Sequence, residues 1–239
     1  MRAMVYLTAA ELDYSRKSEL TEDQKRHADR ADLMTPIVKG WCSEICQELT
    51  SIGVQIHGGM GYIEETGAAQ HFRDARITTI YEGTTSIQAH DLVGRKILKD
   101  KGLALKALLQ DIEFTMSELD TSHGIIARIE HELSQSIKSV KSSLKYLMDN
   151  YRDDHHLAGA ISYNFLMMLG TLIAGWLATR SAQIAVDKIQ SEASDREFYE
   201  SKLVSCQFFT EQILPKVGAY ARSIGSGSVA TMALSEDQF

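Results

Sequence analysis

The sequence predicts an all-α fold in which antiparallel helices form two packed bundles. Only two prolines, Pro36 and Pro215, occur in 239 residues. Leu, Ala, Ile, Lys, Gln and Glu, which favour helices, are abundant. In the second half of the chain, apolar residues recur every three or four positions, which is typical of helices with one buried face. We therefore expect helices with few interruptions throughout.

Composition limits the classes of function. Hydrophobic residues make up 44% and charged residues 24%, as in ordinary soluble globular proteins. The net charge of −7 argues against nucleic acid and against an anionic membrane surface as main partners. Three cysteines are too few for a disulfide framework and favour a reducing cytoplasm. The first residues lack the apolar core and cleavage site of a signal peptide.

The first hundred residues begin with an expected helix over 2–18, rich in Ala and Leu. Residues 19–34 are highly charged and predict a solvated connection or a short polar helix. Thr35 and Pro36 resemble an N-cap followed by proline at the first helical position. A helix is expected from there to about residue 52, with Gly53 as its stop.

Beyond Gly53, three glycines within residues 57–61 predict a tight turn. A short helix is expected over 66–75 and an extended segment over 77–81. The next helix should begin near Thr84 or Thr85 and end near Leu98, where basic residues suit the negative end of its dipole.

Gly102 marks the boundary between the two expected domains, residues 1–100 and 101–239. Beyond it, two apolar stripes predict one-faced helices; the stripes are Leu105, Leu109, Ile112, Met116 and Leu119, then Ile126, Ile129, Leu133, Ile137, Val140, Leu144 and Leu147. Two more helices are expected over about 156–190 and 195–222, with Pro215 as a candidate kink. Residues 225–239 are expected to be loosely ordered.

The uncharged segment from Leu157 to Thr179 is 23 residues long, enough to span a bilayer. Its polar residues and glycines suit lipid poorly. Gly170, Ala174 and Ala178 repeat every four positions, which permits close helix contact. We therefore expect a buried central helix rather than a membrane span.

Two segments carry candidate chemistry. Gln55-Ile-His-Gly-Gly-Met-Gly-Tyr62 follows a helix end, and its glycines allow a ligand to approach the backbone, although such turns usually only reverse the chain. Ile80-Tyr-Glu-Gly-Thr-Thr-Ser-Ile-Gln88 places Glu82 before a helix. That carboxylate is either a favourable charge at a helix N-terminus or a base presented from a rigid helix end.

Together, the order, spacing and wording of these segments resemble the C-terminal helical domain of the acyl-CoA dehydrogenase family over about residues 1–100. Residues 57–95 are most similar to the long bacterial subgroup that carries an appended C-terminal helical domain, to which methylthiopropionyl-CoA dehydrogenases belong. Residues 101–239 have the length and helical pattern of that appendage.

The resemblance implies a role for each matched residue. Glu82 matches the base that removes the α-proton of an acyl-CoA while the β-hydride passes to flavin N5, and its backbone N–H helps to hold the thioester carbonyl. Gly83 lies beside the bound thioester. Positions matching contacts to FAD are Thr84 and Ser86, and, for its adenosine side, the turn of Gln55, Ile56, His57, Gly58 and Gly59.

The same resemblance implies partners. The substrate would be an acyl-CoA and the electron acceptor an electron-transfer flavoprotein. The helical domain looks truncated, and the family's N-terminal helical domain and β-domain are not present. We therefore expect a homo-oligomer or a missing N-terminal half to complete the site, and an isolated chain that is inactive. The alternative is a non-catalytic helical assembly module derived from such an enzyme; an acyl-CoA oxidase is a third reading.

Other candidate sites have simpler interpretations. Cys42 and Cys46 share a helix face, but no other Cys or His pair has zinc-site spacing, so we expect no metal and two small buried thiols. His57 and His71 flank the glycine turn and are expected to make local hydrogen bonds. Trp41 and Trp176 are expected to be core or interface aromatics.

Overall fold

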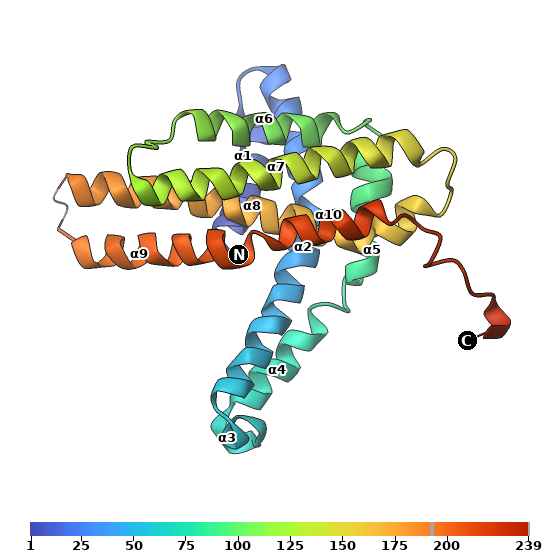
Figure 1. Ribbon diagram of the computed structural model, residues 1–239, viewed down its shortest axis with the longest axis horizontal. Coiled ribbons are helices and arrows are strands. Elements are labelled where there is room, and N and C mark those ends of the chain that lie inside the picture. Colours follow the sequence, from blue (N-terminus) through green and yellow to red (C-terminus); the bar gives the residue numbers. More distant parts are fainter. Residues whose placement is uncertain (192–193, 239) are drawn as a thin grey trace.

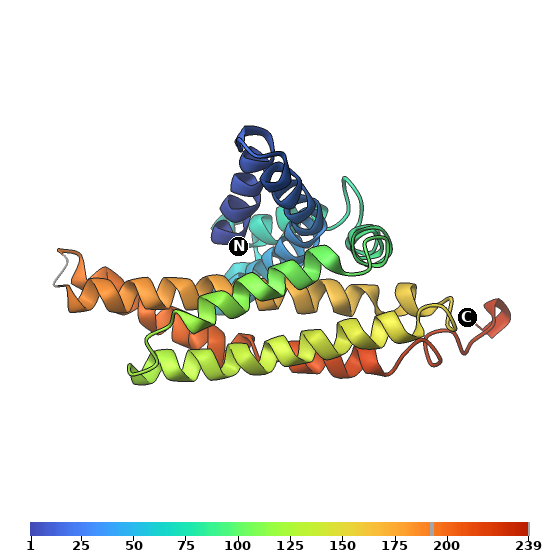
Figure 2. The ribbon, with the colours of Figure 1, turned by 90° about the horizontal axis from the view of Figure 1, so that it is seen from above.

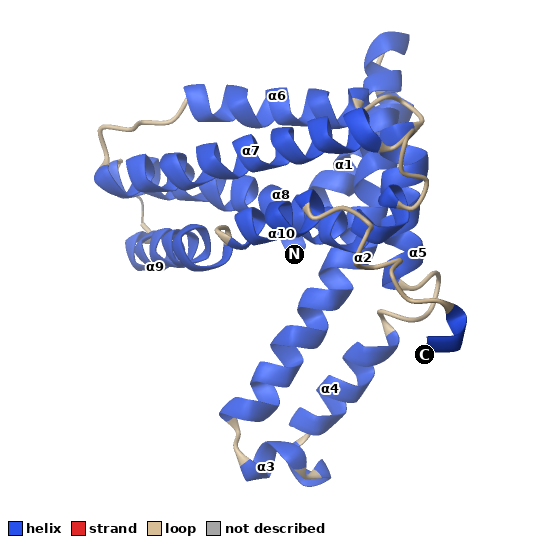
Figure 3. Cartoon of the chain, turned by 45° about the vertical axis from the view of Figure 1, so that its right-hand side comes forward, coloured by secondary structure: helices blue, strands red, loops and turns tan. Residues whose placement is uncertain are grey.

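The computed structural model describes residues 1–191 and 194–238, and within these every regular element is helical and there is no strand (Figure 3). This confirms the predicted fold class. The elements in order are α1 (Arg2–Lys17), α2 (Thr21–Ile56), α3 (Gly59–Tyr62), the 3₁₀ turn η1 (Glu64–Thr66), α4 (Ala68–Ile77), α5 (Thr85–His90), the π-helical η2 (Asp91–Leu98), α6 (Leu103–Ser117), α7 (Gly124–Asn150), α8 (Leu157–Gln190), α9 (Arg196–Phe208), the π-helical η3 (Phe209–Ile213), α10 (Lys216–Gly225) and the 3₁₀ turn η4 (Glu236–Gln238).

A layer along the long axis of the molecule is formed by α7 and α8, which lie side by side, and by α9 and α10, which follow one another along α8 (Figure 1). Helix α1 and the first half of α2 pack together and project from one side of this layer (Figure 2). Helix α2 then crosses α8 and continues outward beside α4. The second half of α2, with α3, η1 and α4, forms a projecting arm that has the glycine turn at its tip (Figures 1 and 3).

Helix α8 is the central element of the core. It is long and apolar enough to cross a membrane by length and composition, but 67% of its most apolar window is buried inside the protein. A single hydrophobic cluster extends from Met4 to Ile224 and includes residues on both sides of Gly102. Gly102 itself has φ 73° and directly precedes α6, so it does separate two helices. The two halves of the chain nevertheless share one core.

Gly170 allows α2 and α8 to approach closely. A Cβ atom at this position would lie 2.2 Å from Cγ of Trp41. The Trp41 indole is buried, and its Nε1–H donates to Oγ1 of Thr171 over 3.2 Å. The predicted close contact at Gly170 and the core placement of Trp41 are therefore confirmed.

The predicted helix start at Thr35–Pro36 and stop at Gly53 were wrong, because α2 is one continuous helix that contains the helix expected up to about residue 52. Pro36 lies inside it, and Thr35 donates its hydroxyl to the Ala31 carbonyl at 2.8 Å instead of capping a helix start. The helix also passes Gly53 and ends at Ile56. The physical reason is tertiary: the buried stripe of Leu33, Met34, Ile37 and Trp41 runs across Pro36, and its burial outweighs the one hydrogen bond that proline removes.

The prediction of an extended segment over 77–81 was wrong. They form turns after α4, in which the N–H groups of Thr78, Thr79 and Ile80 donate to carbonyls three residues earlier at 3.1, 3.4 and 3.0 Å. Pro215 does interrupt the last long helix, since it lies between η3 and α10.

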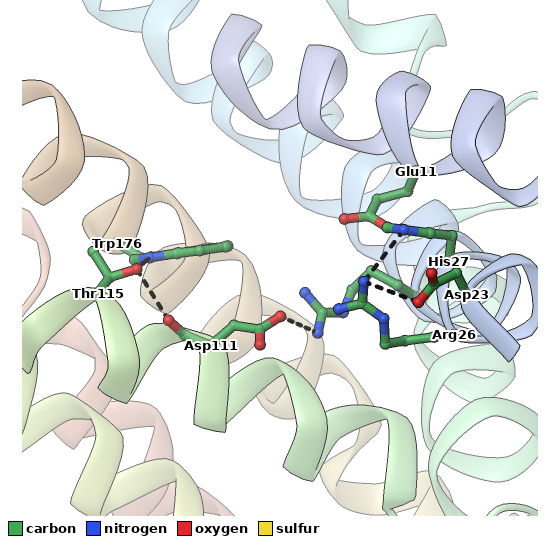
Figure 4. A network of polar contacts seen from close by, with 8 residues as sticks. Glu11, Asp23, Arg26, His27, Asp111, Thr115 and Trp176 are labelled. Carbon is green, nitrogen blue, oxygen red and sulfur yellow. Dashed lines mark hydrogen bonds and ion pairs between the residues drawn. The ribbon is translucent and has the colours of Figure 1, made fainter. Parts of the chain in front are cut away.

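A polar network connects three helices at the centre of the molecule. Nε1–H of Trp176 in α8 donates to Oγ1 of Thr115 in α6 at 2.9 Å, and Thr115 donates to the carbonyl of Asp111 at 3.0 Å (Figure 4). The Asp111 carboxylate accepts from the buried guanidinium of Arg30 in α2 at 2.7 Å. Nearby, His27 of α2 contacts Glu11 of α1 at 2.6 Å. The network fixes α2, which carries the arm, relative to α6 and α8.

Candidate functional site

Glu82 lies on the exposed turn between α4 and α5 and has an unusual backbone. Its φ is +52°, and Glu82 and Lys101 are the non-glycine residues with positive φ among those described. Left-handed backbone is costly for a residue with a Cβ atom and tends to occur at functional sites. No described residue accepts a hydrogen bond from the Glu82 or Gly83 N–H. The turn therefore presents a carboxylate and free backbone donors to the same surroundings.

Gly83 continues the left-handed turn with φ +87°. This backbone favours glycine, and an added Cβ would also lie close, at 3.0 Å, to Nε2 at the end of the Gln88 side chain. Thr84 is the N-cap of α5 and accepts from the Ile87 N–H at 3.3 Å. Ser86 is exposed, and its hydroxyl has no partner within residues 1–191 and 194–238. Local sequence thus determines a helix start that presents two exposed hydroxyls beside Glu82.

The second predicted group lies at the tip of the arm. Gln55, Ile56, His57, Gly58 and Gly59 are exposed there, and Gly58 has φ +61°. Nδ1 of His57 lies 2.8 Å from the Gly53 carbonyl, which confirms a local hydrogen bond. Gln55 lines an open groove of about 720 Å³. Other groove residues are Tyr62, Phe72 and Arg73. The groove combines amide, aromatic, cationic and acidic groups, and Arg73 is paired with Glu64 at 3.0 Å.

The structure brings Glu82, Gly83, Thr84 and Ser86 together but keeps the glycine turn apart from them. Helix α4 separates the two groups, and its 10 residues span about 15 Å at a helical rise of about 1.5 Å per residue. Within one chain, these groups can contact only different parts of a long ligand, or ligands in two different sites.

Several residues around the Glu82 turn were not found from the sequence. Nζ of Lys39 in α2 donates to the Gly83 carbonyl, across 44 positions in the chain. Nε2 of Gln88 donates to the Glu82 carbonyl at 3.2 Å. Oγ1 of Thr85 donates to Glu44 of α2 at 2.5 Å, which fixes the start of α5. No local motif marks Lys39 or Glu44, because both are ordinary polar residues of a long helix.

Titration near α2 is affected by burial. Burial, reinforced by the charge of Glu44, raises the pKa of the Tyr163 hydroxyl. Burial also raises the pKa of the Cys42 thiol. Cys42 and Cys46 are free and partly buried. No cluster of His, Cys, Asp and Glu within the described part of the chain has the arrangement of a metal site.

The donor set fits one side of a large polar cofactor such as FAD. The exposed hydroxyls of Thr84 and Ser86 suit a polyhydroxyl chain, and the amide of Gln55 with the open backbone at Gly58 and Gly59 suits a nucleotide. Added Cβ atoms at Gly58 or Gly59 would meet nothing within 4 Å, so these residues provide a surface and not an enclosed cavity.

Comparison with known proteins assigns both halves of the chain. Residues 105–235 match the family model described as "Acetyl-CoA dehydrogenase C-terminal like", and residues 1–98 match "Acyl-CoA dehydrogenase, C-terminal domain". The chain is 38% identical over 91% of its length to 3-methylmercaptopropionyl-CoA dehydrogenase of Ruegeria pomeroyi, covering 37% of that protein. It is 37% identical over 77% of its length to the broad-specificity linear acyl-CoA dehydrogenase FadE5 of Mycobacterium tuberculosis, covering 31%.

A third relative belongs to a larger complex. It is the caffeyl-CoA reductase-Etf complex subunit CarC of Acetobacterium woodii, 38% identical over 39% of this chain and covering 24% of that protein. The matched parts of the chain thus cover between 24% and 37% of the length of these relatives. With both halves matched, the chain belongs to the acyl-CoA dehydrogenase family.

Proposed function

We propose that this chain is the C-terminal part of an FAD-dependent acyl-CoA dehydrogenase, with Glu82 as the base that begins α,β-dehydrogenation of an acyl-CoA thioester. Family membership supports the reaction class. The observation that carries the assignment of Glu82 is its left-handed backbone, which leaves the carboxylate exposed and its own N–H without a partner in the described chain. Two helices hold this costly conformation in place, which is typical of a functional residue.

In this proposal the residues of the turn act together on the thioester. The Glu82 carboxylate removes the α-proton, and the Glu82 N–H donates to the thioester carbonyl oxygen as negative charge develops there. Gly83 leaves space for the bound thioester because it has no side chain. Exclusion of water by the bound substrate strengthens both interactions.

The cofactor would be held by the two groups of exposed residues described above. Thr84 and Ser86 are positioned to donate hydroxyl hydrogen bonds to FAD beside Glu82, and Gln55 to Gly59 to contact its adenosine side. FAD, when bound, supplies the acceptor for the β-hydride. Because α4 separates the two groups, we propose that they serve different FAD molecules in a homo-oligomer. An electron-transfer flavoprotein is the proposed acceptor, since one relative is named as part of an Etf complex.

The remaining walls of the site would come from protein beyond this chain, since the matched parts cover only 37% and 31% of the first two relatives. We also propose that the boundary between the two domains, residues 1–100 and 101–239, lies between the two matched segments. We expect the isolated chain to be inactive and the enzyme to act in the cytoplasm.

A specific observation favours the second candidate, a non-catalytic helical assembly module. The tip of the arm exposes large apolar side chains, including Ile56 at 78% and Tyr62 at 81%. Exposed apolar patches mark interaction surfaces. In that case, the arm would bind protein and Glu82 would have no chemical role.

A chimera separates the two candidates. The matching 37% of the Ruegeria pomeroyi relative is replaced by this chain, and reduction of the flavin absorption band by 3-methylmercaptopropionyl-CoA is followed without oxygen. We expect Glu82→Gln to keep flavin bound and to slow reduction by about 100-fold or more, the typical contribution of a positioned base. The matched control Glu118→Gln changes an exposed carboxylate after α6 and should reduce normally. Normal reduction in Glu82→Gln would exclude the catalytic assignment.

A further inference from the structure

We propose that Lys39 is a positioning residue that holds the Glu82–Gly83 backbone in its reactive conformation. The inference rests on the proposed function of Glu82, and it adds a residue from a helix outside the recognised motif. It concerns how the turn is held, and not the chemistry that the turn performs.

The contacts of Lys39 are with the turn that carries Glu82. Its Nζ donates to the Gly83 carbonyl and lies 6.0 Å from the ring centre of Tyr81, so it contacts the turn on both sides of Glu82. Lys39 forms no salt bridge with any residue that the structure describes. Its charge is therefore directed at the turn and is not neutralised by a carboxylate.

The turn is held by its carbonyls, which leaves its N–H groups free. The ammonium group of Lys39 donates to the Gly83 carbonyl, and the amide of Gln88 donates to the Glu82 carbonyl at 3.2 Å. Meanwhile the Thr85 N–H donates across the turn to the Thr79 carbonyl at 3.2 Å. With its carbonyls bound to protein, the Glu82–Gly83 segment directs two backbone donors elsewhere, as an oxyanion site requires.

Lys39 makes the strongest of these contacts. A hydrogen bond from a charged donor is about twice as strong as one between neutral groups. It also comes from α2, a helix fixed in the core by Trp41 two positions later. Lys39 thus connects the exposed, energetically unfavourable turn to a helix that is fixed in the core. Gln88 provides no such anchor, because it belongs to α5, which follows the turn directly.

Two measurements test the proposal. In the chain itself, hydrogen exchange of the Thr85 amide reports whether the turn is held; we expect Lys39→Met to speed it about tenfold or more and Lys39→Arg to restore most of the protection, because arginine keeps the charge and the donors. In the chimera, we expect Lys39→Met to lower kcat by about 10-fold to 100-fold with little change in KM and with flavin still bound, since misplacement by about 1 Å has effects of that size. Lys138→Met, an exposed lysine of α7, is the matched control and should change neither quantity.

The outcomes separate this proposal from the proposed function. Unchanged Thr85 exchange in Lys39→Met overturns the positioning role, whatever Glu82 does. Faster exchange with unchanged kcat also overturns it, because the turn would then not need to be held for reaction. If Glu82→Gln reduces flavin normally while Lys39→Met still speeds exchange, the proposed function has failed and Lys39 merely stabilises the turn. Faster exchange and lower kcat in Lys39→Met, both reversed in Lys39→Arg, support the proposal.

Discussion

Replacing Gly170 by alanine places a methyl group against the buried indole of Trp41. The added Cβ would lie 2.2 Å from Cγ, 2.4 Å from Cδ1 and 2.6 Å from Cβ of Trp41. Carbon atoms in favourable contact are about 3.5–4.0 Å apart. The two helices must therefore separate by more than about 1 Å, or the indole must rotate away.

Neither response is easy in this structure. Trp41 is 2% exposed, and its Nε1–H donates to Thr171, the residue that follows Gly170. Overpacking typically costs about 1–3 kcal/mol, and these constraints place Gly170→Ala near the upper end. Alanine recovers about 1 kcal/mol of helix propensity relative to glycine. We expect a net loss of about 2 kcal/mol in the free energy of unfolding.

Urea unfolding followed by circular dichroism measures this loss, with the slope m expected to stay unchanged. The matched control is Gly53→Ala in α2, where the new Cβ meets nothing within 4 Å. It should raise the free energy of unfolding by about 0.5–1 kcal/mol through helix propensity alone. If Gly170→Ala is as stable as the parent chain, or more stable, the close α2–α8 contact does not exist as described.

Three further substitutions test two polar contacts. Asp111→Ala leaves the guanidinium of Arg30 buried without its carboxylate and should lower the free energy of unfolding by about 2 kcal/mol. Arg30→Met removes the buried charge itself and should lower it by less than about 1 kcal/mol. Equal losses in urea unfolding would contradict this asymmetry. The Ser228 hydroxyl, 2.5 Å from the Asp154 carboxylate, holds the pKa of that carboxyl below its ordinary value of 3.8. A lowered pKa stabilises the folded state above about pH 3.8, and this contribution is lost as pH falls through the folded-state pKa. Ser228→Ala should move the pKa of Asp154 back towards 3.8, as measured by NMR titration, and an unmoved pKa would assign the shift to the backbone donors.

Much of the fold follows from local patterns. The apolar stripes of α6 and α7, the uncharged centre of α8 and the break at Pro215 were all predicted, because each depends on residues three or four positions apart. The failures occurred where distant residues decide. Pro36 and Gly53 are local helix breakers, yet α2 continues through both, and around Pro36 the burial of Leu33, Met34, Ile37 and Trp41 outweighs the local preference.

The candidate site divides in the same way. The sequence placed Glu82, Gly83, Thr84 and Ser86 on one turn, and the structure confirms that they lie together. The sequence predicted the short helix between them and Gln55 to Gly59, but not that this helix holds the two groups apart, because a motif records order along the chain and not distance in space. The contacts of Lys39 and Glu44 were not predicted, because these residues belong to a helix some 40 positions away in the sequence.

By itself, then, the sequence determined the helices, the family resemblance and the residue in the position of the base. Only the tertiary structure decided how that residue is presented. The left-handed backbone at Glu82 lies where Lys39 and Gln88 donate hydrogen bonds to the carbonyls of Gly83 and Glu82. Backbone strain of this kind persists only when the surrounding structure maintains it, and the Lys39 contact comes from α2, a helix distant in the sequence.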